Sequence, residues 1–429
     1  MIAAIIKTCK QYHVIASNFF FLSVVEGIKL IMPFIAMPYI IHVCGASNYG
    51  KIVFAQAIMT YFTMLVNFGL NVVTVKEISD NLHVPEKISQ IISSFLTLRF
   101  ILVAAGLIIL FLLTVFLPLL RSYRLLLLFC YIAVVAEGML TTAFFQGIEK
   151  MHNITLIQTF AVIFYISTLF IFVRRESDYI FVPLLQSTGL FLSAVAGIIL
   201  MITKYHIKLC LPQAEAILQL FKKSITFAIS RLSVAVTTNM AKLFTGLTLG
   251  MQEVALLDLA QKISDAALLP ASILDQAIYP YNAKKQDRLL ATKMFVMMLI
   301  VGCICAAIMF LGIPLAVRIL GAGKLGAAIP LAYWLCIRVI INVMVLYTGT
   351  PLLVAFGYPR PFNFSVIICA GTMILLYLLL YVLNQLSLYA FVALLIINDL
   401  IILVYRLFYC LKYKILSLKI QPCNQEKTL

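Results

Sequence analysis

Residues 294–317 read MFVMMLIVGCICAAIMFLGIPLAV, a stretch of 24 residues without one Asp, Glu, Lys, Arg or His. A helix of about 20 apolar residues crosses the hydrocarbon core of a bilayer. Eleven further apolar stretches of similar length lie along the chain, so we expect an all-α polytopic membrane protein of about twelve transmembrane helices. The expected spans are 17–43, 52–73, 92–118, 125–147, 154–173, 180–203, 224–249, 254–280, 294–317, 327–355, 361–383 and 388–411.

The composition excludes the main alternatives to a helical membrane protein. The chain is 63% hydrophobic and 11% charged, with a mean hydropathy of +1.08. Soluble domains carry about 25% charged residues. A β-barrel would show alternating segments of about 10 residues, which are absent. The stretch 17–43 is longer than a signal peptide's apolar region and has no small-residue cleavage site, so we expect a retained helix.

The cysteines and histidines do not indicate a metal site. The ten cysteines include no CxxC pair, and the five histidines lie near expected helix ends or in loops. No histidine is placed beside cysteines or acids at the spacing of metal ligands. We therefore expect no metal site.

The distribution of Lys and Arg predicts the orientation. With a cytoplasmic N-terminus, 18 basic residues fall in cytoplasmic segments and 7 in outer loops. Both termini are therefore expected in the cytoplasm. Much of the net charge of +16 reflects this asymmetry, and no aromatic–basic nucleic-acid motif accompanies it. We expect the lipid bilayer as a partner and no nucleic acid.

A weak internal repeat suggests two six-helix halves. A shift of 205 residues places Gly45 on Gly250, Ala55–Gln56 on Ala260–Gln261, and Ile58 on Ile263. Parallel repeats of this kind commonly surround a central cavity that opens alternately to either side of the membrane. We expect an N-terminal bundle at 1–205, a cytoplasmic linker at 206–223, a C-terminal bundle at 224–413 and a cytoplasmic tail at 414–429.

Seven basic residues lie inside the expected spans, where a charge costs about 2.5–3.5 kcal/mol on insertion scales. Such groups usually face a wet cavity or a partner. The seventh span places Arg231, Thr238, Lys242 and Thr245 on one face, and the tenth carries Arg338 with Asn342. The eighth span places Lys262 on a polar face with Asp258, Asp265, Ser272 and Gln276. The seven residues are Lys29, Arg99, Arg231, Lys242, Lys262, Arg338 and Arg406.

Two interpretations of these bases stay open. In one, Lys29, Arg231, Lys242, Lys262 and Arg338 bind an anionic group such as a diphosphate. In the other, local pairs cancel the charge, namely Asp258 with Lys262 and Glu26 with Lys29. Arg231, Lys242 and Arg338 have no acid one helical turn away, which favours the first interpretation for them. Arg99 and Arg406 lie near the cytoplasmic ends, where snorkelling is expected.

Six acids lie inside the same spans, and an intramembrane acid can couple transport to protons or sodium. Glu137 and Asp399 lie near the middle of their spans and are the first candidates, with Asp258 and Asp265 as further ones. An ion pair with a cavity base is an equal alternative. The six are Glu26, Glu137, Asp258, Asp265, Asp275 and Asp399.

The stretch 33–57, PFIAMPYIIHVCGASNYGKIVFAQA, resembles the opening of bacterial O-antigen flippases. These form the polysaccharide-transport branch of the multidrug/oligosaccharidyl-lipid/polysaccharide exporter superfamily. Further similarity lies in Phe68–Asn71 with Lys76–Ile78, in Phe145–Lys150, and in Ala260–Lys262 with Tyr279–Pro280. Gln261 stands where the family commonly has Glu, while Lys262 is retained. The matching residues of the opening are Pro33, Pro38, Gly45, Asn48, Tyr49, Gly50, Ala55 and Gln56.

The resemblance implies twelve helices in two bundles, no cofactor, and an undecaprenyl-diphosphate-linked oligosaccharide as substrate in the bacterial inner membrane. It also implies contact with other polysaccharide-assembly proteins. A cation-coupled drug exporter of the same superfamily is one alternative, although seven bases against six acids do not favour it. A membrane-embedded glycosyltransferase or polymerase is the other. No loop is long enough for a catalytic domain, so we expect no enzyme.

Overall fold

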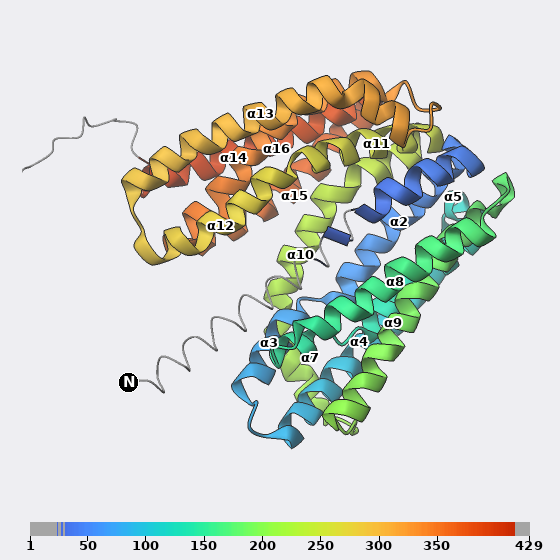
Figure 1. The fold of residues 1–429 in the computed structure, drawn as a ribbon, viewed down its shortest axis with the longest axis vertical. Coiled ribbons are helices and arrows are strands. Elements are labelled where there is room, and N and C mark those ends of the chain that lie inside the picture. Colours follow the sequence, from blue (N-terminus) through green and yellow to red (C-terminus); the bar gives the residue numbers. More distant parts are fainter. Residues whose placement is uncertain (1–23, 25–26, 29–30, 417–429) are drawn as a thin grey trace, which may run out of the picture. The chain divides into compact units, whose positions relative to one another are not determined.

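The computed structural model describes residues 24, 27, 28 and 31–416, and every regular element among them is helical. The predicted all-α class is therefore confirmed for this part of the chain (Figure 1). A short apolar helix at Ile31–Cys44 precedes the labelled elements. These are α2 Ala46–Asn67, α3 Leu70–Asp80, α4 Pro85–Phe116, α5 Pro118–Arg121, α6 Arg124–Met139, α7 Thr142–Gly147, α8 Met151–Phe172, η1 Glu176–Ile180, α9 Phe181–Tyr205, α10 Ala214–Thr248, α11 Met251–Ala267, α12 Leu269–Lys285, α13 Arg288–Leu320, α14 Ala328–Tyr347, η2 Thr348–Val354, α15 Pro359–Val382 and α16 Leu388–Lys412.

Nine helical segments of the described chain are long and apolar enough to cross a membrane. They match nine of the twelve predicted spans. The predicted span 17–43 lies partly outside the described residues. The predicted span 224–249 is helical within α10, which is about 52 Å long at 1.5 Å per residue.

The predicted span 254–280 is not one helix, and this corrects the sequence prediction. It divides into α11 and α12 at Leu268, and Pro270 stands in the first turn of α12. Proline has no N–H for the helical ladder, and its ring clashes with the preceding turn, so a helix commonly restarts there. The polar face predicted from Asp258 to Gln276 is therefore divided between two helices.

Three other predicted spans are interrupted as well. Phe68 and Gly69, both with positive φ, separate α2 from α3. Leu140 and Thr141 separate α6 from α7, and α14 passes into the π-helical turn η2, which contains Pro351. Inside a membrane, backbone groups freed at such breaks must be satisfied by neighbouring protein groups.

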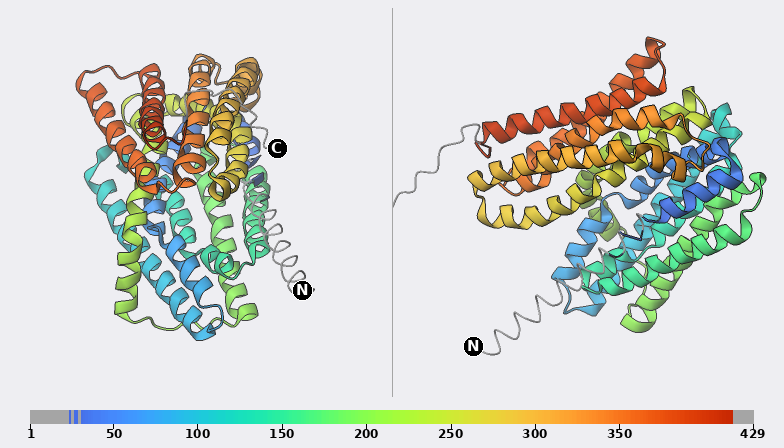
Figure 2. Two further views of the ribbon diagram at one scale, coloured as in Figure 1. Left: turned by 90° about the vertical axis from the view of Figure 1, so that its left-hand side faces the viewer. Right: turned by 45° about the horizontal axis from the view of Figure 1, so that its top comes forward.

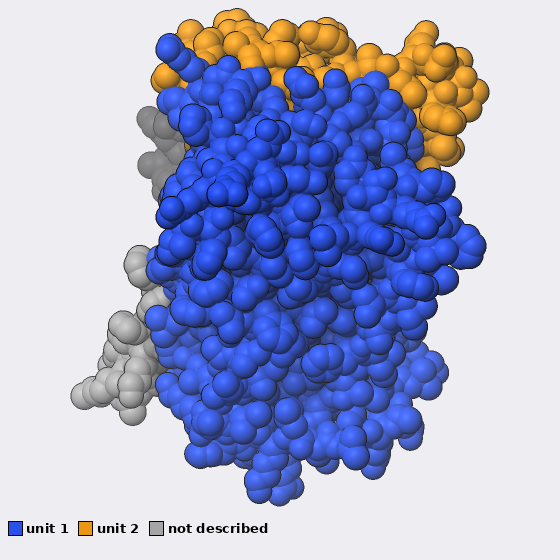
Figure 3. Space-filling model, turned by 90° about the vertical axis from the view of Figure 1, so that its right-hand side faces the viewer, with its two compact units in different colours: residues 1–255, 318–325 blue, residues 256–317, 326–429 orange. Residues whose placement is uncertain are grey.

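The chain divides by contacts into two compact units (Figure 3). Unit 1 comprises Met1–Ala255 with Arg318–Leu325, and unit 2 comprises Leu256–Val317 with Gly326–Leu429. The division predicted from the sequence is a different one, between two repeated six-helix bundles joined by the linker 206–223. It stays a prediction. The contact boundary falls later because α10 packs on α2 and α3 of unit 1.

Small residues allow this close packing within unit 1. A Cβ added to Gly246 of α10 would lie 2.2 Å from Cδ2 of Phe54 on α2. A Cβ on Gly69 would lie 2.3 Å from Cβ of Phe227 on α10. Glycine therefore lets the helix backbones approach, as in membrane helix pairs generally. Elsewhere in this unit, α9 runs beside α8 (Figures 1 and 2). The helix α9 also packs against α6.

Unit 2 is built around α14, α15, α16 and η2. Its core includes Met298 of α13 and Tyr347 of α14, both with no exposed surface. The Tyr347 hydroxyl donates to the carbonyl of Ala291 at 2.9 Å. Asn282 of α12 donates to the carbonyl of Pro351 at 3.0 Å, so α12 satisfies backbone exposed by the π-helical turn.

Candidate substrate site

Unit 2 brings together one base and two acids of the predicted site. The Nε of Arg338 on α14 donates to Oδ2 of Asp399 on α16 at 2.9 Å. The same oxygen accepts from Nδ2 of Asn342 at 2.9 Å. Asp265 of α11 lies 3.6 Å from the Arg338 guanidinium and is mostly exposed. Both acids lie on helices other than α14. The residues one turn away from Arg338 in the sequence therefore gave no sign of these partners.

Lys262 and Asp258 form the second ionic contact of unit 2. Their atoms Nζ and Oδ2 lie 2.9 Å apart on successive turns of α11, and Asp258 is almost completely buried. This confirms the local pair predicted from the spacing. The other predicted pair, Glu26 with Lys29, lies outside the described residues.

These contacts change the electrostatic description of the predicted site. Lys262 faces Asp258, and Arg338 faces Asp265 and Asp399, so each base lies beside at least one carboxylate. These are two groups of ion pairs and not an open basic surface. For Arg338, the ion-pair alternative is the one the structure shows.

Arg231 and Lys242 lie on α10 in unit 1. Arg231 is exposed and Lys242 is half-buried. Eleven residues are three helical turns, so the two side chains leave the same face about 16 Å apart along the axis. Thr238 and Thr245 of this face donate to carbonyls of their own helix, at Val234 and Ala241. The basic character of this face therefore depends on Arg231 and Lys242.

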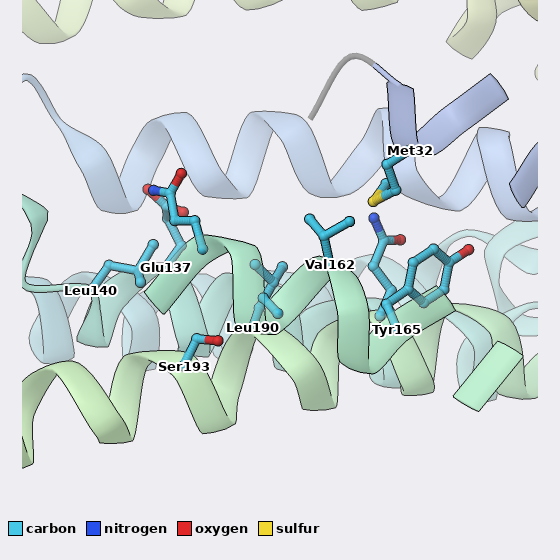
Figure 4. Close-up of a pocket in the computed structure, with 10 residues that line it drawn as sticks. Met32, Glu137, Leu140, Val162, Tyr165, Leu190 and Ser193 are labelled. Atoms are coloured by element: carbon cyan, nitrogen blue, oxygen red, sulfur yellow. The ribbon is translucent and has the colours of Figure 1, made fainter. Parts of the chain in front are cut away.

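Glu137 lines a cavity of about 180 Å³ within unit 1 (Figure 4). The cavity lies among α6, α8, α9 and the helix Ile31–Cys44, with Glu137 and Ser193 toward one end and Met32 and Tyr165 toward the other. The hydroxyl of Ser193 and the Oε1 of Gln158 are buried without a hydrogen-bond partner among the described residues. The full lining is Met32, Glu137, Leu140, Gln158, Ala161, Val162, Tyr165, Gln186, Leu190 and Ser193.

The prediction that Arg99 snorkels toward the membrane surface is wrong. Its side chain is completely buried and lies over the Phe95 ring at 4.4 Å. It donates to the backbone carbonyls of Glu137 at 2.8 Å and Leu140 at 3.2 Å, where α6 ends. Its second nitrogen donates to the amide oxygens of Asn67 and Asn71, which flank the break between α2 and α3.

The same network holds the carboxylate of Glu137. Nδ2 of Asn67 donates to Oε1 of Glu137 at 3.2 Å, while Oδ1 of Asn67 accepts from Arg99. One asparagine thus links the buried arginine to the cavity acid. The pair Asn67 and Asn71, four residues apart around Gly69, was the available sequence signal for this network.

Arg406 in unit 2 repeats the arrangement, so snorkelling is wrong for this residue too. It is 6% exposed and lies over the Phe362 ring at 4.7 Å. It donates to the carbonyl of Val345 at 2.7 Å, just before the π-helical turn, and to Oγ of Ser365 at 3.0 Å. In each unit, a buried arginine satisfies carbonyls at a helix break.

The structure places the predicted residues in separate groups. Arg338, Asp265 and Asp399 meet in unit 2, Lys262 pairs with Asp258, Arg231 and Lys242 share a face of α10, and Glu137 lines a cavity. Lys29 lies outside the described residues. Among the described residues, no group of three or more His, Cys, Asp and Glu is placed to hold a metal ion.

The fold is that of multi-pass helical membrane transporters. The inward-facing conformation of a multidrug resistance MATE family transporter of the MOP superfamily is similar, with a TM-score of 0.69. That likeness has 13% identity and covers 92% of this chain and 98% of the other. The lipid II flippase MurJ in an inward closed conformation gives a TM-score of 0.62 at 13% identity, over 92% of this chain and 89% of that one.

The chain belongs to the polysaccharide biosynthesis protein family, whose model matches residues 15–286. It is 25% identical over 370 residues to the "Putative O-antigen transporter" of Escherichia coli (strain K12), covering 84% of this chain and 88% of that one. The same-named protein of Shigella dysenteriae is 27% identical over 314 residues, covering 71% and 77%. These relatives are named as transporters, in agreement with the expectation that the chain is not an enzyme.

Proposed function

We propose that this protein is a flippase that moves undecaprenyl-diphosphate-linked O-antigen units from the cytoplasmic to the periplasmic leaflet of the bacterial inner membrane. The observation that supports the proposal is the match to two proteins named "Putative O-antigen transporter", over 84% of the chain for the first and 71% for the second. The proposed topology keeps twelve spans, with α10, the pair α11–α12 and the first span added to the nine apolar segments. The bundles 1–205 and 224–413 would alternate access, with both termini in the cytoplasm.

The proposed anion-binding set keeps Lys29, Arg231, Lys242, Lys262 and Arg338, but the contacts give its members unequal weight. Arg338 and Lys262 already face carboxylates. Arg231 is exposed and shares its face with Lys242. A diphosphate attracts the exposed Arg231 more strongly than it attracts Arg338 and Lys262, which already face carboxylates. Arg231 is therefore the first position to test, together with Lys242 of the same helix face.

Among the proposed coupling acids, Glu137 is the one whose carboxylate lines a cavity and is hydrogen-bonded by a neutral group. Its carboxylate accepts from the neutral amide of Asn67 and lines a cavity. Asp399 is bound by a guanidinium and Asp258 by an ammonium group. Asp265 is exposed beside Arg338. Binding and release of a cation therefore require less rearrangement at Glu137 than at Asp399 or Asp258.

The test is complementation of a bacterial strain that lacks its own O-antigen flippase, with the lipopolysaccharide ladder as readout. We expect the chain to restore the ladder and the variant Arg231→Gln/Lys242→Gln to lose most of it at equal protein level. Arg174→Gln/Arg175→Gln is the matched control, because these two arginines are exposed in a predicted outer loop. Drug resistance without any ladder would support the multidrug-exporter alternative.

A further inference from the structure

A groove of about 680 Å³ lies in unit 1 against α4, α5 and α6. It is separate from the cavity at Glu137, and its volume falls within the usual range of ligand pockets. Its wall is apolar over most of its length and basic at one end. The lining residues are Leu107, Ile108, Leu110, Phe111, Thr114, Val115, Arg121, Arg124 and Leu128.

The basic end is formed by Arg121, the last residue of α5, and Arg124, the first residue of α6. Both side chains are exposed, and among the described residues neither makes an ion pair or a side-chain hydrogen bond. A cation at a helix N-terminus is disfavoured by the helix dipole, so Arg124 does not stabilise α6 through its charge. The sequence has no Asp or Glu from 87 to 136, so the neighbouring segments supply no counter-charge.

The apolar part is suited to a hydrocarbon chain. Ile108 and Phe111 of α4 are 61% and 65% exposed, as expected of apolar side chains that face lipid in a membrane-spanning helix. From Leu107 to Val115 the wall extends about 12 Å, close to the depth of one leaflet's hydrocarbon. In the predicted orientation, Arg121 and Arg124 lie in an outer loop, at the level of the outer-leaflet headgroups. A phosphate at that level and a chain below it would match both parts of the groove.

We propose that this groove binds an anionic phospholipid of the outer leaflet, with its phosphate on Arg121 and Arg124 and one acyl chain along α4. Guanidinium groups bind phosphate through paired N–H donors. The two positive charges, with no acid nearby in the sequence, give this end its preference for a headgroup of net negative charge. The undecaprenyl chain of the proposed substrate has eleven isoprene units and far exceeds the apolar wall in length. The phospholipid is therefore the better fit, and the inference does not depend on the transport function.

The experiment measures phospholipid binding to the purified full chain in detergent by native mass spectrometry. Phosphatidylglycerol is compared with phosphatidylcholine of the same acyl chains. We expect phosphatidylglycerol to bind more tightly, and Arg121→Gln/Arg124→Gln to weaken it about 25-fold, at about fivefold per arginine. Arg121→Lys/Arg124→Lys should keep most of the preference, because the charges remain.

The control Arg174→Gln/Arg175→Gln removes the same charge from another predicted outer loop and should change binding less than twofold. Equal losses in the two double variants would overturn the proposal, as would equal binding of the two phospholipids. Undecaprenyl phosphate is the third probe. If it binds more tightly than phosphatidylglycerol with the same dependence on Arg121 and Arg124, the site belongs to the polyprenyl lipid and the proposal is wrong. Unchanged elution and thermal unfolding of each variant establish that it is folded.

Discussion

Arg338 on α14 donates through Nε to Asp399 on α16 at 2.9 Å, and both side chains are largely shielded from solvent. The two residues are 61 positions apart, and both stood among the predicted functional residues. Because the two residues are paired, each charge is largely neutralised by the other. The pairing also makes the two residues a structural link between α14 and α16, in addition to any part in transport.

Removal of Asp399 should destabilise the protein. Breaking a buried pair leaves the other charge uncompensated, at a cost of about 3–5 kcal/mol. We expect Asp399→Ala to lower the free energy of unfolding by about 3 kcal/mol and Arg338→Ala/Asp399→Ala to recover part of this loss. Thermal unfolding in detergent provides the measurement. Asp265→Ala, at an exposed carboxylate, should cost less than about 1 kcal/mol. Equal losses in Asp399→Ala and Asp265→Ala would contradict the assignment.

Arg99 should not tolerate replacement by lysine. Its guanidinium reaches two backbone carbonyls and two asparagines at once, and a lysine ammonium cannot reproduce this fork. We expect Arg99→Lys to lose about 2 kcal/mol, since each charged hydrogen bond contributes about 1.5–3 kcal/mol. Folded yield and unfolding temperature report the change, with exposed Arg174→Lys as the control. Wild-type stability of Arg99→Lys would show that the fork is dispensable.

Two glycine-to-alanine changes should have opposite signs. Gly246→Ala would place a methyl group 2.2 Å from a ring carbon of Phe54, which is fully buried and has no room to move. Overpacking of this kind costs about 1–3 kcal/mol. Gly312 of α13 has open space around its Cβ position, so Gly312→Ala should stabilise the helix by up to about 1 kcal/mol. Paired unfolding measurements check the order, and a destabilising Gly312→Ala with a neutral Gly246→Ala would refute it.

Glu137→Gln separates a coupling role from a structural one. Glutamine retains an oxygen that accepts from Asn67, so we expect normal folding. Loss of the ionisable group should reduce the lipopolysaccharide ladder about tenfold if Glu137 binds the coupling cation. Ser193→Ala, in the same cavity, removes a hydroxyl that has no partner among the described residues and should leave both stability and ladder intact. A full ladder from Glu137→Gln would remove this residue from the coupling proposal.

Local chemistry explains which predictions from sequence succeeded. Apolar length alone identified nine spans, because burial of a continuous run of side chains in lipid depends on length and composition. The pair Asp258–Lys262 followed from helical spacing, since residues four apart are neighbours on any helix. Gly45 and Gly250, aligned by the 205-residue shift, both have positive φ and directly precede helices α2 and α11.

Long-range contacts explain the errors. For Arg99 and Arg406 the sequence predicts snorkelling to the membrane surface, because an arginine near a helix end usually extends toward water. Their true partners, carbonyls at the breaks in α6–α7 and α14–η2, are 38 to 61 residues away and exist only where those helices are interrupted. The partner of Arg338 is likewise on another helix.

The sequence by itself determined a helical membrane protein, most of its spans and the set of charges inside them, because hydrophobicity and helical spacing are local properties. Only the tertiary structure decided which of those charges cancel. Whether an intramembrane base meets a carboxylate, a freed carbonyl or open space depends on which helices pack together. Arg338 is therefore paired with an acid. Arg99 and Arg406 donate hydrogen bonds to carbonyls where helices are interrupted. Among the predicted bases that the structure describes, the exposed Arg231 on α10 is the most accessible to an anion.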